Sequence, residues 1–167
     1  MITKFTITNF KRLASTELEL GNAAIFIGPN NSGKTTALQA LALWDIGWRR
    51  WSEKREKSDK DTTSLKQPPA ERVGVTINRR DLYSIPMPSA RLLWNDLRTQ
   101  ANIVIDKKQS TQKVYITLKA EGVHEDKPWF CTLEFYYANE ESFYCRLKES
   151  SEAGRIPAGA KRHAVVY

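Results

Sequence analysis

The sequence is poor in the residues that build disulfide frameworks and zinc sites. It contains only two cysteines and two histidines (Cys131, Cys145, His124 and His163), and these have no metal-ligand spacing. We therefore expect reduced cysteines in the core and no zinc site. No apolar stretch approaches the length of about 18 residues that a membrane helix needs, and the N-terminus lacks the unbroken apolar block of a signal peptide. A cytoplasmic protein without a membrane partner is the expectation.

Acidic residues are fewer than basic ones, 19 against 26, which gives a formal net charge of +7. This balance permits attraction to nucleic acid, but composition alone does not name a partner. The densest basic run, residues 48–60, has acidic residues interspersed at helical spacing. We predict a solvated helix face there. Binding of DNA through this run is the alternative, and it would show a steep fall of affinity with salt.

The first part of the chain has the alternation of β-strands. Residues 2–8 and 16–20 alternate apolar and polar side chains, whereas residues 23–27 form a short continuous apolar run. Gly21 and Asn22 lie between the second and third of these segments. The pattern predicts a β-hairpin at Gly21-Asn22 and, at residues 23–27, a strand buried on both faces.

Helical periodicity follows, from residue 34 to about residue 50. One stripe of this helix carries Ala37, Leu41, Trp44, Trp48 and Trp51. We interpret the tryptophans as core packing rather than as a base-stacking platform. Residues 58–71 are polar and end in prolines, which predicts an internal loop or linker.

The second half of the chain is predicted to be rich in strands. Ser89 is expected to cap a short helix through Leu97, and Asn139-Glu140 is expected to form a hairpin turn. The predicted strands cover residues 73–77, 103–105, 114–118, 129–137, 142–147 and 163–167. The fold class is therefore α/β, with a mixed or antiparallel β-subdomain and one long helix. A run of strands disfavours the alternating architecture of small-molecule P-loop kinases.

Residues 28–35, Gly-Pro-Asn-Asn-Ser-Gly-Lys-Thr, match the phosphate-binding pattern G-x-x-x-x-G-K-[ST] at every fixed position. The motif follows the apolar run and opens the helix, so that backbone N–H groups and the positive helix end favour an anion. We predict that Lys34 lies between the β- and γ-phosphates of ATP and serves hydrolysis, and that Thr35 is a ligand of Mg²⁺. The predicted nucleotide-binding residues of the loop are Gly28, Asn30, Asn31, Ser32, Gly33, Lys34, Thr35 and Thr36. A glycine turn without a ligand is the alternative.

The loop and the segments before it resemble the ATPase head of the ABC-type SMC, RecF and OLD group. The resemblance rests on a first strand, Asn9-Phe10-Lys11-Arg12, a second strand and the Gly-Pro-Asn-Asn-Ser-Gly-Lys-Thr loop within the first 40 residues. It implies an N-terminal lobe that holds the P-loop and a β-subdomain, with ATP bound between two heads of a dimer. It also implies a nucleotide contact at Lys11, for which a solvated loop charge is the alternative.

Hydrolysis in such heads needs a second carboxylate at the end of an apolar strand. Asp106 follows residues 103–105, but Lys107 occupies the place of the expected glutamate, so we predict that Asp106 is a strand-end turn residue. A Leu-Ser-Gly-Gly-like signature does not occur in the sequence. We therefore predict that residues 1–167 are a single N-terminal lobe, cut from a longer protein whose downstream motifs complete the ATPase.

Two functions remain open from the sequence. The first is the ATP-binding lobe of an ATPase in DNA repair or phage defence, which dimerises through its heads, acts with DNA or an attached nuclease, and shows little turnover as this chain alone. The second is a non-catalytic, nucleotide-sensing module whose β-rich half regulates a partner such as a nuclease.

Overall fold

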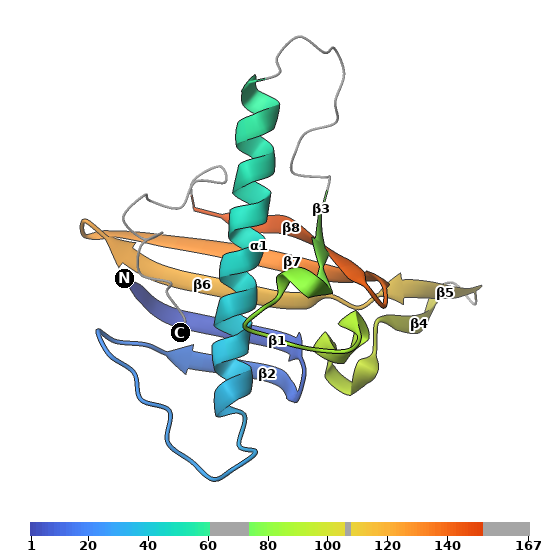
Figure 1. Cartoon of the computed structure of the whole chain (residues 1–167), viewed down its shortest axis with the longest axis horizontal. Coiled ribbons are helices and arrows are strands. Elements are labelled where there is room, and N and C mark those ends of the chain that lie inside the picture. Colours follow the sequence, from blue (N-terminus) through green and yellow to red (C-terminus); the bar gives the residue numbers. More distant parts are fainter. Residues whose placement is uncertain (61–73, 106–107, 152–167) are drawn as a thin grey trace.

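A computed structural model describes residues 1–60, 74–105 and 108–151. One long helix, α1 (Lys34–Lys60), crosses one face of a six-stranded antiparallel sheet with the order β2-β1-β6-β7-β8-β3 (Figure 1). A two-stranded ribbon, β4-β5, projects beside this sheet. The strands are β1 (Ile2–Phe10), β2 (Leu13–Glu19), β3 (Val75–Asn78), β4 (Gln100–Ile105), β5 (Lys108–Lys113), β6 (Ile116–His124), β7 (Lys127–Asn139) and β8 (Ser142–Ser150).

The tryptophan stripe of α1 forms the core with the inner face of the sheet, as the periodicity predicts. Trp44, Trp48 and Trp51 are each at most 4% exposed. The sheet contributes alternate residues of its strands, such as Phe5 and Ile7 of β1, which are fully buried. The apolar face of the helix packs against the apolar face of the sheet, and the two layers enclose one hydrophobic core.

The predicted hairpin at Gly21-Asn22 is wrong. The hairpin is instead β1-β2, whose turn is Lys11-Arg12, and residues 23–27 form no strand. Ile25 and Ile27 are 84% and 89% exposed. A continuous apolar run becomes a buried strand only where neighbouring strands lie along it. In the described part of the chain β2 is the edge of the sheet, and the run leaves the sheet there without pairing.

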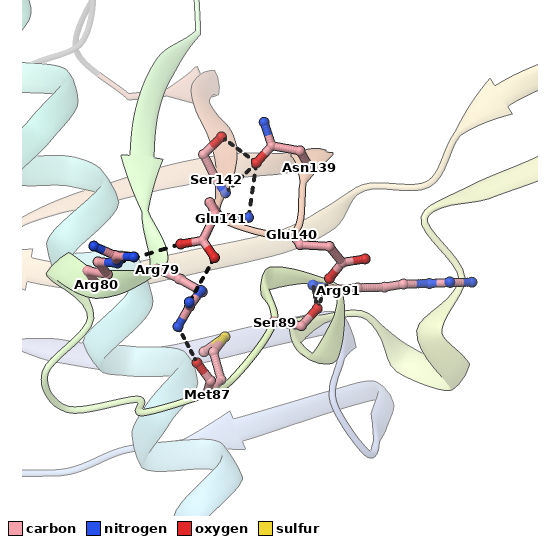
Figure 2. A network of polar contacts seen from close by, with 9 residues as sticks. All are labelled: Arg79, Arg80, Met87, Ser89, Arg91, Asn139, Glu140, Glu141 and Ser142. Carbon is pink, nitrogen blue, oxygen red and sulfur yellow. Dashed lines mark hydrogen bonds and ion pairs between the residues drawn. The ribbon is translucent and has the colours of Figure 1, made fainter.

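The strands predicted at 103–105, 129–137 and 142–147 form with longer ends, whereas β3 and β6 begin two residues after their predicted starts. The predicted hairpin turn at Asn139-Glu140 is present but shifted by one residue, to Glu140-Glu141. The Asn139 Oδ1 atom accepts hydrogen bonds from the backbone amides of Glu141 and Ser142, each at 2.9 Å (Figure 2). Strand β5 was not predicted, because its polar sequence Lys-Gln-Ser-Thr-Gln-Lys has no apolar alternation.

The single short helix predicted from Ser89 to Leu97 is wrong. The segment forms two 3-10 turns, Ala90–Leu93 and Asn95–Leu97, which follow a third at Arg79–Asp81. Ser89 does cap the first of them, since its Oγ atom accepts from the Arg91 amide at 3.2 Å. Asp96 and Leu97 have positive φ angles of 50° and 57°, which an α-helix does not allow.

Two arginines of the basic run in α1 pair with acidic side chains, in keeping with a solvated helix face. Arg49 lies 2.6 Å from Asp45 on the same helix, and Arg50 lies 3.0 Å from Asp81. Cys131 and Cys145 are free and buried, as expected, and burial raises the pKa of both thiols.

Parts of three predictions lie outside the described residues. Residues 58–60 of the expected linker belong to α1, which ends at Lys60. Residues 61–71 of that linker, Asp106 and the predicted strand at 163–167 lie outside the described residues. Among the residues that are described, no helix combines the length and the apolar character that crossing a membrane requires.

Candidate functional site

The predicted phosphate-binding loop joins the edge of the sheet to the start of α1. Residues 20–33 run from the end of β2 to Lys34, below the sheet in the view of Figure 1. The loop encloses an open cavity of about 270 Å³. The residues that line it are Arg12, Asn30, Asn31, Ser32, Gly33, Lys34, Thr35 and Thr36. The structure thus brings together every predicted loop residue at one cavity except Gly28, which contributes through its carbonyl group.

Backbone amides at the start of α1 make this cavity suitable for an anion. The first hydrogen bond of the helix runs from the Ala37 amide to the Gly33 carbonyl oxygen at 2.9 Å. The amides of Lys34, Thr35 and Thr36 precede it, and helix geometry gives them no acceptor within the helix. The positive end of the helix dipole lies at the same place. These groups therefore favour a phosphate over a neutral ligand.

The Lys34 side chain folds back over the loop. Its Nζ atom donates to the carbonyl oxygens of Gly28 and Pro29, both at 2.7 Å, and reaches Ser32 Oγ at 3.4 Å. These acceptors are neutral. A phosphate oxygen carries negative charge and forms a stronger, charge-assisted hydrogen bond with an ammonium group. Lys34 can therefore give up its hydrogen bonds to the loop carbonyl groups in favour of bonds to a phosphate.

Gly33 is required by the shape of the loop. Its φ angle is +100°, and a Cβ atom at this position would lie 3.3 Å from Leu13 Cδ2 in strand β2. Asn31, two residues earlier, also has a positive φ angle, of 68°. Left-handed residues next to right-handed ones turn successive N–H groups toward the same side of the chain, which is the geometry of an anion-binding nest.

The two basic residues of the β1-β2 turn point to different partners. Arg12 lines the cavity, and its Nη1 atom donates to Asn31 Oδ1. Lys11 instead donates from Nζ to Gln39 Oε1 of α1 at 2.7 Å and does not line the cavity. Burial lowers the pKa of Lys11. Of the two basic residues, Arg12 is the one that lines the cavity. The nucleotide contact that the resemblance implies for Lys11 stays a prediction.

Residues 1–119 match the AAA ATPase domain family. The match includes the β1-β2 hairpin, the loop and α1, and it covers more than half of the 167 residues. The chain belongs to the AAA ATPase domain family. The members of this family are ATPases, which bind ATP and typically use Mg²⁺. The phosphate-binding loop of this chain lies within the matched residues. A comparison with curated protein sequences gave no significant match.

The residues of this AAA ATPase domain fit the phosphates of a nucleotide. A single ammonium group, a glycine whose Cβ would lie 3.3 Å from Leu13 of the neighbouring strand, and helix amides without internal acceptors converge on one cavity. Its volume lies just below the range of about 300–1,000 Å³ typical of pockets that enclose a drug-sized ligand. The cavity therefore suits the phosphate chain, with the nucleoside outside it.

Proposed function

We propose that the chain binds Mg²⁺-ATP at residues 28–36, as the N-terminal lobe of an SMC/RecF/OLD-like ATPase head. The observation that carries the proposal is the convergence of Lys34 and the first amides of α1 on one open cavity. Backbone amides from Asn31 onward bind the phosphate oxygens, and Lys34 moves from the loop carbonyls to the β- and γ-phosphates.

The metal ion belongs beside the hydroxyl group of Thr35. This residue is exposed at the second position of α1 and lines the cavity. Bound Mg²⁺ would neutralise charge on the phosphate oxygens. Thr36, which also lines the cavity, lies on the α-phosphate side, and Arg12 supplies a second positive charge at the rim.

The assignment to a head of this group is supported by the segment that precedes the loop. Ile25 and Ile27 are apolar, strongly exposed and directly N-terminal to Gly28. Exposed apolar side chains at alternate positions are expected where another strand is to be added. In our proposal a further strand that ends in the missing carboxylate pairs here, and a signature motif from a second head closes over the nucleotide.

The cellular role proposed for such a head is DNA repair or defence against phage, in the cytoplasm. ATP would close a dimer of heads and hydrolysis would reopen it, which changes the state of DNA or of an attached nuclease by population shift. The alternative is a nucleotide-sensing module without turnover. Steady hydrolysis by the longest native form of the protein, lost on substitution of Lys34, would exclude this alternative.

Substitution of Lys34 tests the proposal directly. Lys34→Ala removes the one ammonium group inside the loop, and we expect the binding of a fluorescent ATP analogue to fall below detection in anisotropy measurements. Lys4→Ala is the matched control, because Lys4 pairs with Glu17 at 2.7 Å on the sheet, away from the cavity. Unchanged affinity in Lys34→Ala would overturn the assignment.

A further inference from the structure

The β1-β2 turn connects the phosphate cavity to a second, distant segment of the chain. On one side, Arg12 reaches Asn31 in the loop. On the other side, the Lys11 amide donates to the Leu93 carbonyl oxygen at 2.8 Å, and Asn95 Nδ2 donates to the Lys11 carbonyl oxygen at 2.6 Å. Two adjacent residues therefore contact the site and the segment Trp94–Leu97 at the same time.

We propose that this turn transmits nucleotide binding to residues 94–97, and that Asn95 is the positioning residue that joins the two. The inference rests on the nucleotide binding proposed above and adds a regulated element to it. Nucleotide in the cavity would hold the turn, and through it residues 94–97, in the conformation seen here. Without nucleotide, the segment would open more often.

Arg12 is the part of the turn that responds to the ligand. In the structure its guanidinium group bonds a neutral amide oxygen, that of Asn31. A phosphate at the cavity offers two anionic oxygens in the geometry that a guanidinium group binds best, and such bonds are stronger than bonds to neutral acceptors. Nucleotide would therefore anchor the turn more firmly than Asn31 alone.

Lys11 can transmit the restraint from Arg12 to Asn95, because three hydrogen bonds fix Lys11 in the turn. Its amide and carbonyl groups are both taken by the segment that contains Leu93 and Asn95, and its side chain is held by Gln39. Its φ angle of 48° lies in the left-handed region. A residue bonded on both main-chain sides leaves little freedom between Arg12 and Asn95.

Within residues 94–97, the part that follows the buried Trp94 has the properties of an element that opens locally. Asp96 and Leu97 are consecutive non-glycine residues with positive φ angles, and Leu97 is 43% exposed. Such strained backbone persists only where surrounding contacts hold it. The preceding part of the segment is held separately, because the Ala90 amide bonds the Glu140 carbonyl oxygen at 2.8 Å and Ser89 bonds the Glu140 side chain (Figure 2). Opening is thereby confined to the end that Asn95 secures.

Hydrogen exchange with and without a slowly hydrolysed ATP analogue and Mg²⁺ tests this coupling. The reporting amides are those of Leu97 and Arg98, whose acceptors are the Trp94 and Asn95 carbonyl oxygens in the segment, and that of Lys11, whose acceptor is the Leu93 carbonyl oxygen just before it. In the unsubstituted protein we expect nucleotide to slow their exchange by about fivefold or more, the lower end of common coupling strengths. The amides of the loop, residues 31–36, report binding itself.

The variant Asn95→Asp keeps the shape of the side chain and removes the donor to Lys11. We expect residues 94–98 to exchange rapidly with or without nucleotide. By reciprocity the dissociation constant of the nucleotide should rise by a comparable factor, about fivefold. Arg12→Ala should also abolish the effect of nucleotide on residues 94–98 while the bond from Asn95 remains. Asn78→Ala is the control, because Asn78 is exposed and makes no capping bond.

The outcomes separate the two proposals. If nucleotide protects the loop but leaves the exchange of residues 94–98 unchanged or faster, the coupling is refuted while nucleotide binding stands. The same holds if Asn95→Asp retains the full nucleotide effect. If nucleotide fails to protect the loop in the unsubstituted protein, the proposed function itself is refuted, and the coupling with it.

Discussion

At the residue scale, the site depends on backbone conformations that one side chain would disturb. Gly33 combines a φ angle of +100° with a position where a Cβ atom would lie 3.3 Å from Leu13 Cδ2 and 3.8 Å from Arg12 Cδ. Left-handed conformations cost a residue with a Cβ atom about 1–2 kcal/mol. The glycine therefore holds the loop close to the β1-β2 hairpin, whose residue Arg12 lines the cavity.

Gly33→Ala should weaken nucleotide binding more than it weakens the fold. The added methyl group forces either the loop or Leu13 to move, which displaces the amides at the start of α1 from the phosphates. We expect the dissociation constant to rise about tenfold or more, which corresponds to a loss of about 1.4 kcal/mol, in calorimetric titrations. Gly21→Ala is the matched control, because its nearest contact would be the Ala23 carbonyl oxygen at 3.9 Å. Wild-type affinity in Gly33→Ala would contradict this account of the loop.

The sequence predicts most of this site because the phosphate-binding motif is local. Eight consecutive residues specify the turn, the amides and the ammonium group, and six of them, residues 30–35, line one cavity. The sequence does not predict which of the two adjacent basic residues faces the loop. That choice depends on the left-handed backbone at Lys11 and on the acceptor that Gln39 offers from α1, and neither is encoded within the turn itself.

At the element scale, α1 lies unusually close to the sheet at Gly47. A Cβ atom there would lie 2.8 Å from two ring atoms of Phe135 and 3.0 Å from Cys145 Sγ. Glycine in a helix interior costs about 1 kcal/mol relative to alanine. The close approach explains why the helix carries it nonetheless: both partners are fully buried and have no room to retreat.

Gly47→Ala should destabilise the protein in spite of the better helix propensity of alanine. Overpacking of a filled core commonly costs about 1–3 kcal/mol, which outweighs a propensity gain of about 1 kcal/mol. Urea unfolding followed by circular dichroism measures the difference. Glu53→Ala, at an exposed position of the same helix, should leave the midpoint nearly unchanged. A variant at residue 47 more stable than wild type would show that the helix can shift away from the sheet.

The sequence predicts well those elements whose apolar face packs against another element within the described part of the chain. The tryptophan stripe of α1 is buried, and Trp44 packs on Trp129 of β7, so the helical pattern and the burial agree. Residues 23–27 have an equally clear apolar pattern but no adjacent strand. Strand β5 has the opposite character, because it pairs through its backbone with β4 while its polar sequence has no apolar alternation.

At the scale of the whole molecule, the turn between β7 and β8 holds the long connection between β3 and β4, residues 79–99, against the sheet. Glu141 is the centre of this contact (Figure 2). Its side chain accepts from Arg79 Nη2 at 2.7 Å, and its carbonyl oxygen accepts from the Arg79 amide at 2.9 Å. Arg79 also donates to the Met87 carbonyl oxygen at 3.2 Å. One carboxylate thus joins segments more than 60 residues apart in sequence.

The Glu141 contact should give the stability of the whole domain a defined pH dependence. The hydrogen bond from Arg79, together with the charges of Arg79 and Arg80, lowers the pKa of Glu141 below its ordinary value of 4.5. A lowered folded-state pKa means that the stabilisation is present above pH 4.5 and is lost as the pH falls through the folded-state value. Glu141→Gln should therefore melt at a lower temperature than wild type at pH 7.

The difference between Glu141→Gln and wild type should shrink as the pH is lowered below 4.5, because protonation removes the charge that the variant already lacks. Differential scanning fluorimetry from pH 7 to pH 3 follows it. Glu53→Gln, on the exposed face of α1, should match wild type at every pH. An equal deficit of Glu141→Gln at pH 3 and pH 7 would contradict this account, because it would show that the deficit does not come from the lost charge of Glu141.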